Sequence, residues 1–98
     1  MFENANKSVL ELYFYIGEII ENNIKWGNKF VDELSIELKA RFPKAKGYSP
    51  RNLRNMRKYY LSVKDNEELK KLSYKIPWSH NTIIMDRVKN NNEKNIKI

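Results

Sequence analysis

Apolar side chains recur every three or four residues along the first quarter of the chain, starting after Ser8. They are Val9, Leu12, Tyr13, Ile16, Ile20 and Ile24. Glutamates fall between these positions, so the pattern predicts an amphipathic helix that ends near residues 22 and 23. Gly17 lies inside this helix at a cost of about 1 kcal/mol relative to alanine, which indicates that another backbone or side chain approaches closely there.

A second apolar stripe follows residues 26–28 and predicts a second helix. Its members are Phe30, Val31, Leu34, Leu38 and Phe42. Pro43 should end this helix, because proline disfavours helical geometry in the residue before it. Residues 44–48 then form a predicted loop. Ser49 and Pro50 should start a third helix, since serine is a preferred N-cap and proline suits the first helical position.

The third helix is predicted to run over residues 50–63 and to have two unlike faces. At about 100° per residue, apolar side chains gather on one face, polar ones lie opposite, and Arg57 lies at a flank. The apolar face holds Leu53, Met56, Tyr60 and Val63, and the polar face holds Arg51, Arg54, Asn55 and Lys58.

The last third of the chain has weaker patterns. Residues 64–71 are polar and predict the end of the third helix or a turn. Apolar residues alternate with polar ones from Leu72 to Trp78, which predicts a short extended segment that Pro77 restricts to an edge or a loop. Ser79 is the expected N-cap of a last helix. That helix contains Ile83, Ile84, Arg87 and Val88.

Together the elements predict a mainly α fold. We expect a small helical bundle with a helix-turn-helix-like arrangement, of which a winged helix is one variant. With 98 residues and 41% hydrophobic content, the chain can form one core and not two. We therefore expect a single helical domain over residues 1–89 and a polar, Asn/Lys-rich C-terminal tail over residues 90–98.

The net charge of +7 is concentrated in one part of the chain. Residues 1–37 carry three lysines against seven acids, or −4, and residues 65–98 carry seven cations against five acids, or +2. Residues 38–64 carry nine cations and no acid, or +9. A concentrated basic patch attracts polyanions, so nucleic acid becomes the leading class of partner.

Composition argues against several other functions. The chain has no cysteine and one histidine, His80, which excludes thiol chemistry and a histidine pair for a metal. Three glutamates of the first helix, Glu11, Glu18 and Glu21, are expected to have no basic partner nearby and are interpreted as solvated surface. Since no nucleophile, base and orienting group can be assembled, we expect no enzymatic activity, cofactor, metal or small-molecule substrate.

No apolar run approaches the roughly 18 residues that a membrane span needs, and the N-terminus lacks the layout of a signal peptide. We therefore expect a cytoplasmic protein that does not bind membranes.

The basic helix has the side chains of a nucleic-acid reader. Arginine can bond guanine, asparagine can pair with adenine, and cations at a helix start can meet phosphate. A capped second helix that presents such groups is typical of helix-turn-helix proteins, although the connection over residues 42–49 is longer than usual. DNA is the expected partner and RNA the alternative. The predicted binding residues are Lys44, Lys46, Tyr48, Arg51, Arg54, Asn55, Arg57 and Lys58.

Structural interpretations of the same residues stay open. The cations can be the solvated face of an amphipathic helix, although ordinary surfaces intersperse both signs of charge. Tyr60 is expected in the core, whereas Tyr48 and Tyr59 are either packing residues or platforms on which bases stack. Trp26 and Trp78 are expected to be core anchors.

A protein-interaction or oligomerisation module is the second hypothesis. The acidic first helix of one copy could meet the basic helix of another, giving a homodimer whose association salt weakens. This hypothesis is compatible with DNA binding, because helix-turn-helix proteins often bind as dimers.

Three stretches occur in an order that resembles a known family: WGNKFVDELSIELKARFP, GYSPRNLRNMRKYY and IPWSHNTIIMDRV. They resemble the N-terminal domain of YhcG-like proteins, bacterial chains that end in a PD-(D/E)XK nuclease domain, over residues 9–89. In that family the domain is regarded as a helical, DNA-binding-like module placed before the nuclease. The matching positions are Gly47, Ser49, Pro50, Arg51, Asn52, Leu53, Met56 and Arg57, with Pro77, Trp78, His80 and Asn81.

The resemblance implies a module that targets or positions a nuclease, and it gives none of these residues a catalytic role. The chain departs from the family in length, because no Pro-Asp followed by a Glu-X-Lys strand is present. We expect either a fragment that ends before the nuclease domain or a stand-alone relative. In either case the Pro-Trp-Ser-His-Asn block can also be a structural corner that packs Trp78.

Overall fold

Helices make up almost all of the structure. The computed structural model describes residues 2–23, 25 and 27–96, with side chains described for residues 4–23, 25, 27 and 29–87. The helices are α1 (Phe2–Asn22), α2 (Asn28–Arg41), α3 (Pro50–Val63), α4 (Glu67–Ser73) and α5 (Trp78–Ile96). The described residues contain no strand. The predicted small all-α bundle is confirmed.

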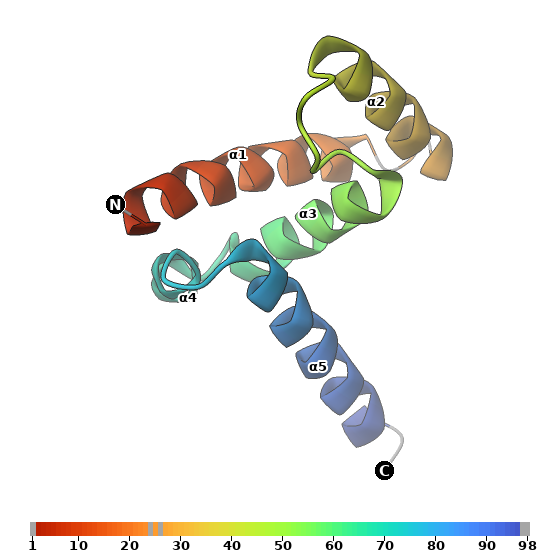
Figure 1. The fold of residues 1–98 in the computed structure, drawn as a ribbon. Coiled ribbons are helices and arrows are strands. Elements are labelled where there is room, and N and C mark those ends of the chain that lie inside the picture. The colour runs from red at the N-terminus through yellow and green to blue at the C-terminus, as the bar shows by residue number, and fades with distance from the viewer. Residues whose placement is uncertain (1, 24, 26, 97–98) are drawn as a thin grey trace.

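The central helix of the bundle is α3, which contacts all four other helices. Figure 1 shows α1 and α3 side by side and antiparallel, with α2 across one end of the pair and α4 at the other end. From the middle of this arrangement α5 leads away from the body. The helix that carries the predicted binding residues is therefore also the helix around which the others pack.

The core lies mainly between α1 and α3, in two clusters of buried side chains. One cluster contains Ile16, Ile20, Val31, Leu53 and Met56. The other contains Leu10, Tyr59 and Val63. The predicted apolar face of α3 is thus correct for Leu53, Met56 and Val63.

The tyrosines of α3 are the exception to this prediction. Tyr59 is only 1% exposed, and its hydroxyl shares a 2.6 Å hydrogen bond with Ser73. Tyr60 is half-buried and packs on the ring of Phe14, with 4.9 Å between the ring centroids. The expectation that Tyr60 lies in the core is wrong, and of the two interpretations left open for Tyr59 the structure supports packing. Ser73, the partner of Tyr59, belongs to α4, a helix that was not predicted from the sequence.

Gly17 marks the closest approach of α1 to α3. A Cβ atom at this position would collide with the backbone carbonyl oxygen of Met56 and with the Cβ of Tyr60. The close approach expected from the sequence is confirmed, and the glycine is required because the obstacle is backbone, which cannot rotate away.

Local signals set the ends of α2 and α3 as expected. The Ser49 hydroxyl accepts a 3.2 Å hydrogen bond from the Asn52 backbone N–H, and Pro50 is the first residue of α3. The non-helical backbone of Phe42 before Pro43, with φ −129° and ψ 67°, ends α2. Capping and proline chemistry are short-range, so the sequence alone was sufficient here.

The structure corrects the predictions for the last third. A separate helix, α4, occupies part of the segment interpreted as polar or extended, with Asn66 as its cap. Alternation from Leu72 to Trp78 therefore reflects a helix end, a turn and a helix start, and not a strand. The last helix begins one residue before Ser79, so Ser79 is not its cap.

The backbone of α5 continues to Ile96, through most of the segment predicted as a tail. The predictions for Ile24, Trp26 and the side chain of Val88 lie outside what the structure describes.

The change Gly17→Ala should destabilise the fold. Alanine raises helix propensity, but its Cβ must displace the α3 backbone, and overpacking of this kind costs about 1–3 kcal/mol. We expect a lower urea midpoint in circular dichroism. The control is Glu18→Ala in the next position of α1, which should leave the midpoint unchanged or raise it. An unchanged midpoint for Gly17→Ala would refute the close packing of α1 against α3.

Candidate nucleic-acid interface

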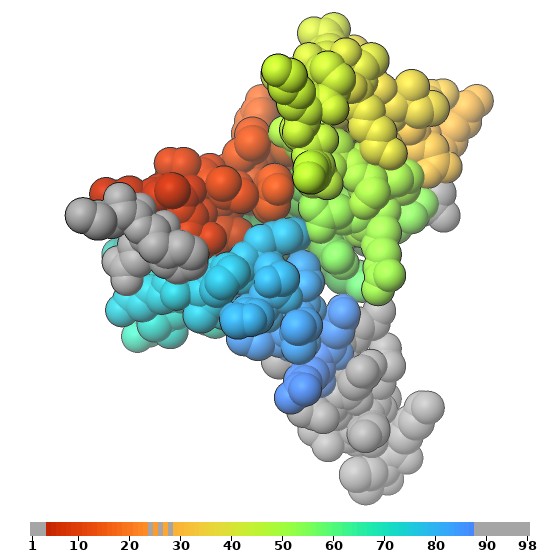
Figure 2. Space-filling view, in the orientation of Figure 1, coloured from red at the N-terminus to blue at the C-terminus, as the bar shows by residue number. Residues whose placement is uncertain are grey.

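Three cations at one end of α3 have no ion pair among the described residues. Lys44 and Lys46 lie in the loop between α2 and α3, and Arg51 lies in the first turn of α3. All three side chains are exposed. Figure 2 shows the loop after α2 on the surface beside the start of α3. We call these three residues the basic edge.

The other three predicted cations pair with acids from other helices. Arg57 on α3 donates to Glu21 of α1 across 2.7 Å. Arg54 lies 3.6 Å from Asp32 of α2. Lys58 lies 3.7 Å from Asp86 of α5. The expectation that Glu21 lacks a basic partner is wrong, because the partner is 36 residues away in sequence.

These ion pairs tie the polar face of α3 to its neighbours without sealing it. The Arg54 and Lys58 side chains are each 42% exposed, and pairs of this kind contribute about 0–1 kcal/mol to stability. A phosphate can compete for such cations, but only by displacing a carboxylate that already lies there. The basic edge faces no such competition from the described residues.

A shallow groove of about 670 Å³ opens beside the basic edge. The loop, the first turns of α3, the first turn of α5 and one tyrosine of α1 line it. The lining residues are Tyr13, Lys46, Gly47, Ser49, Arg51, Asn52, Asn55, Trp78 and Thr82. We call this groove the α3 trough. It brings two cations, amides and two aromatic rings together from three helices and a loop.

Asn52 holds the walls of the α3 trough in place. Its Nδ2 donates to the Gly47 carbonyl oxygen across 2.7 Å, and its Oδ1 accepts from Trp78 Nε1 across 2.8 Å. One side chain therefore joins the loop, α3 and α5. This role was not predicted from the sequence, where Asn52 stood out only as one of the positions that match the family.

The aromatic residues of the trough pack closely. The rings of Tyr13 and Trp78 meet edge to face, with 4.8 Å between centroids. Burial raises the pKa of the Tyr13 hydroxyl above its usual value, and the nearby Tyr48 adds to this shift. The hydroxyl therefore stays neutral at physiological pH. A Cβ on Gly47 would collide with this hydroxyl, so a larger residue at position 47 would require the Tyr13 side chain or the loop to shift.

Tyr48, the aromatic residue among the predicted binding residues, makes packing contacts. It is half-buried, packs against the core and lies 6.2 Å from the ring of Phe42. Its carbonyl oxygen accepts a hydrogen bond from Ser35. Tyr59, buried against Ser73, has no surface on which a base could stack. Trp78 packs against both core clusters, as expected of an anchor.

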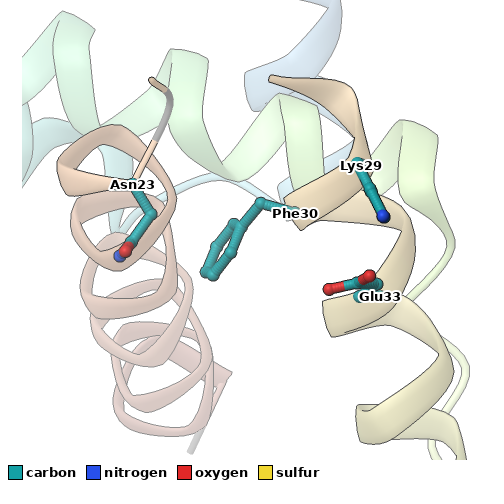
Figure 3. A pocket seen from close by; sticks show the side chains of 4 residues that line it. All are labelled: Asn23, Lys29, Phe30 and Glu33. Carbon is teal, nitrogen blue, oxygen red and sulfur yellow. The ribbon is translucent and has the colours of Figure 1, made fainter. Parts of the chain in front are cut away.

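A second hollow, of about 380 Å³, lies between the end of α1 and the start of α2 and is lined by Asn23, Lys29, Phe30 and Glu33 (Figure 3). Its two charges have opposite signs. His80 is exposed at the start of α5. Among the described residues, no group of three or more His, Cys, Asp or Glu side chains could hold a metal.

The described helices include none that is long and apolar enough to cross a membrane.

One comparison with known proteins identifies a family. A family model described as the DUF1016 N-terminal domain matches residues 1–96, and it fits the resemblance to the N-terminal domain of YhcG-like proteins. Neither a curated protein nor a solved structure matches the chain.

The change Asn52→Ala should loosen the α3 trough. It leaves Trp78 Nε1 and the Gly47 carbonyl without their partner, and each unsatisfied group costs about 1–3 kcal/mol if water cannot replace the bond. We expect a lower urea midpoint and faster amide exchange around residues 46–48. The matched control is Asn55→Ala, one turn later, whose side chain makes no hydrogen bond to any described residue. Equal midpoints for the two variants would contradict the role of Asn52.

Proposed function

The chain belongs to the family of DUF1016 N-terminal domains, and we propose that this domain binds nucleic acid, with DNA as its main partner, through the basic edge. The observation that carries the proposal is the set of three exposed, unpaired cations at one end of α3. They lie within the 27 residues, 38–64, that contain no acid. Backbone phosphates are the partners that such a cluster attracts most strongly.

The proposed binding residues fall into two groups. Lys44, Lys46 and Arg51 make the first contacts with phosphate because no described acid competes for them. The paired cations Arg54, Arg57 and Lys58 contribute less, since each must give up a carboxylate. Asn55 lines the α3 trough and is the proposed contact with a base. Tyr48 holds the loop by packing against the core.

The wider role follows from the family resemblance. In the chains that this domain resembles, a nuclease domain follows, so the module would bring a nuclease to its DNA target. Here only the DUF1016 N-terminal domain is identified, and no catalytic domain. A cytoplasmic DNA-binding module without activity of its own is the proposed role of this chain.

Self-association is the second candidate function, and an apolar groove favours it. The groove holds about 470 Å³ and lies where the end of α3, α4 and α5 meet. Leu69, Leu72 and Ile84 line it and are 44–53% exposed. Because Glu21 and Asp32 already pair within the chain, this groove supports a homodimer better than the charge segregation does.

The basic edge predicts salt-dependent binding that is lost when its charge is reversed. If the edge neutralises about three phosphates, log K should fall with log salt at a slope of roughly −2.7. In fluorescence anisotropy with labelled DNA, Lys46→Glu/Arg51→Glu should reduce affinity by at least about tenfold and flatten the slope by roughly two.

The control is Lys71→Glu/Lys75→Glu, an equal charge change at exposed positions near α4. If this control loses as much affinity, only net charge matters and the basic edge is not the site. Light scattering without nucleic acid tests self-association, which predicts that the apparent molecular mass rises with protein concentration.

A further inference from the structure

The polar face of α3 is flanked along much of its length. Asp32 of α2 lies beside Arg54, and Asp86 of α5 lies beside Lys58. Thr82 and Trp78 of α5 border the trough that contains Asn55. Thus the first turns of α5 lie beside the face that a recognition helix would present to DNA.

This flanking conflicts with insertion of α3 along a major groove. An α-helix with its side chains is about 10–12 Å across, and the major groove of B-DNA is about 12 Å wide, so one helix fills it. The first turns of α5, held beside α3 by Trp78 and Asp86, occupy space that the duplex would need around α3. In addition, the more than half-exposed carboxylates of Asp32 and Asp86 would face the phosphates on either side.

The α3 trough, by contrast, has the chemistry for a single unpaired nucleotide. Lys46 and Arg51 at its rim suit the phosphate, and the half-buried rings of Tyr13 and Trp78 offer an apolar surface for a base. The side-chain amide of Asn55 has no partner among the described residues, so it can donate to and accept from a base edge. A base inside a continuous duplex is stacked and paired and cannot enter such a groove.

We propose that the α3 trough takes one unpaired nucleotide, so that the domain prefers DNA with single-stranded, frayed or branched segments to continuous duplex. This inference rests on the proposed function, because the basic edge supplies the phosphate contacts. It adds the class of DNA and the position of the base: against Tyr13 and Trp78, with Asn55 at its polar edge.

The first test compares probes on the unmodified protein. Anisotropy is measured with a labelled single strand of about ten nucleotides, a length within the usual site sizes, with its blunt duplex, and with a single strand of equal length made of abasic units. The bases of the single strand should raise affinity by about tenfold over the abasic strand, which carries the same charge, and by at least as much over the blunt duplex.

The second test fills the trough without changing charge. Asn55→Leu/Thr82→Leu should reduce the affinity for the single strand to that for the abasic strand. The matched control, Asn22→Leu at an exposed position at the end of α1, should retain the preference. Circular dichroism checks that each variant is folded. If a variant is unfolded, the first test still decides, because it uses the unmodified protein.

The outcomes separate the two proposals. Equal binding of single strand, abasic strand and duplex, all lost in Lys46→Glu/Arg51→Glu, would overturn the trough and keep the basic edge. A single-strand preference that survives Asn55→Leu/Thr82→Leu in folded protein would place the base elsewhere and also overturn the inference. No binding to any probe at low salt would overturn the proposed function itself.

Discussion

The close packing of α1 against α3 at Gly17 and Met56 is the constraint on which the rest of the structure depends. Because the two backbones approach so closely, the apolar faces of both helices close over two core clusters. Val31 of α2 completes one of these clusters, and Trp78 of α5 packs against both. The other helices, α2, α4 and α5, contact α3 less extensively than α1 does, and α3 is the helix that they share.

This arrangement changes how the charge of the chain is understood. In the sequence, acids and cations are segregated, with −4 in residues 1–37 and +9 in residues 38–64. In the fold, the helices that carry the acids pack around α3, and three of its cations gain carboxylate partners. The unpaired cations that remain in the predicted site lie at one end of α3, so binding is expected at that end and not along the helix.

The family motif acquires a physical explanation from the same geometry. Gly47 admits the Tyr13 hydroxyl, Ser49 caps α3, and Asn52 links the loop to Trp78. Asn81 is buried and donates to the carbonyl oxygens of Ser73, Ile76 and Pro77, which closes the turn before α5. These residues therefore have structural roles, either around the α3 trough or in the turn before α5.

The sequence predicted the features that depend on neighbouring residues and missed those that depend on distant ones. The limits of α3 follow from Ser49 and Pro50, and the end of α2 follows from Pro43. The short helix α4 has seven residues, too few for a clear period. The choice of Tyr59 over Tyr60 for the core depends on Ser73, and the Arg57–Glu21 pair joins residues 36 apart.

The central claim is that nucleic acid binds at the end of α3 formed by the basic edge and the α3 trough. The most direct measurement is a nuclear magnetic resonance titration of isotope-labelled protein with a short DNA strand that has an unpaired segment. The account predicts that the largest shifts cluster in residues 44–55, at the Trp78 indole N–H and around Thr82. The largest shifts on α4, or no shifts at low salt, would contradict it.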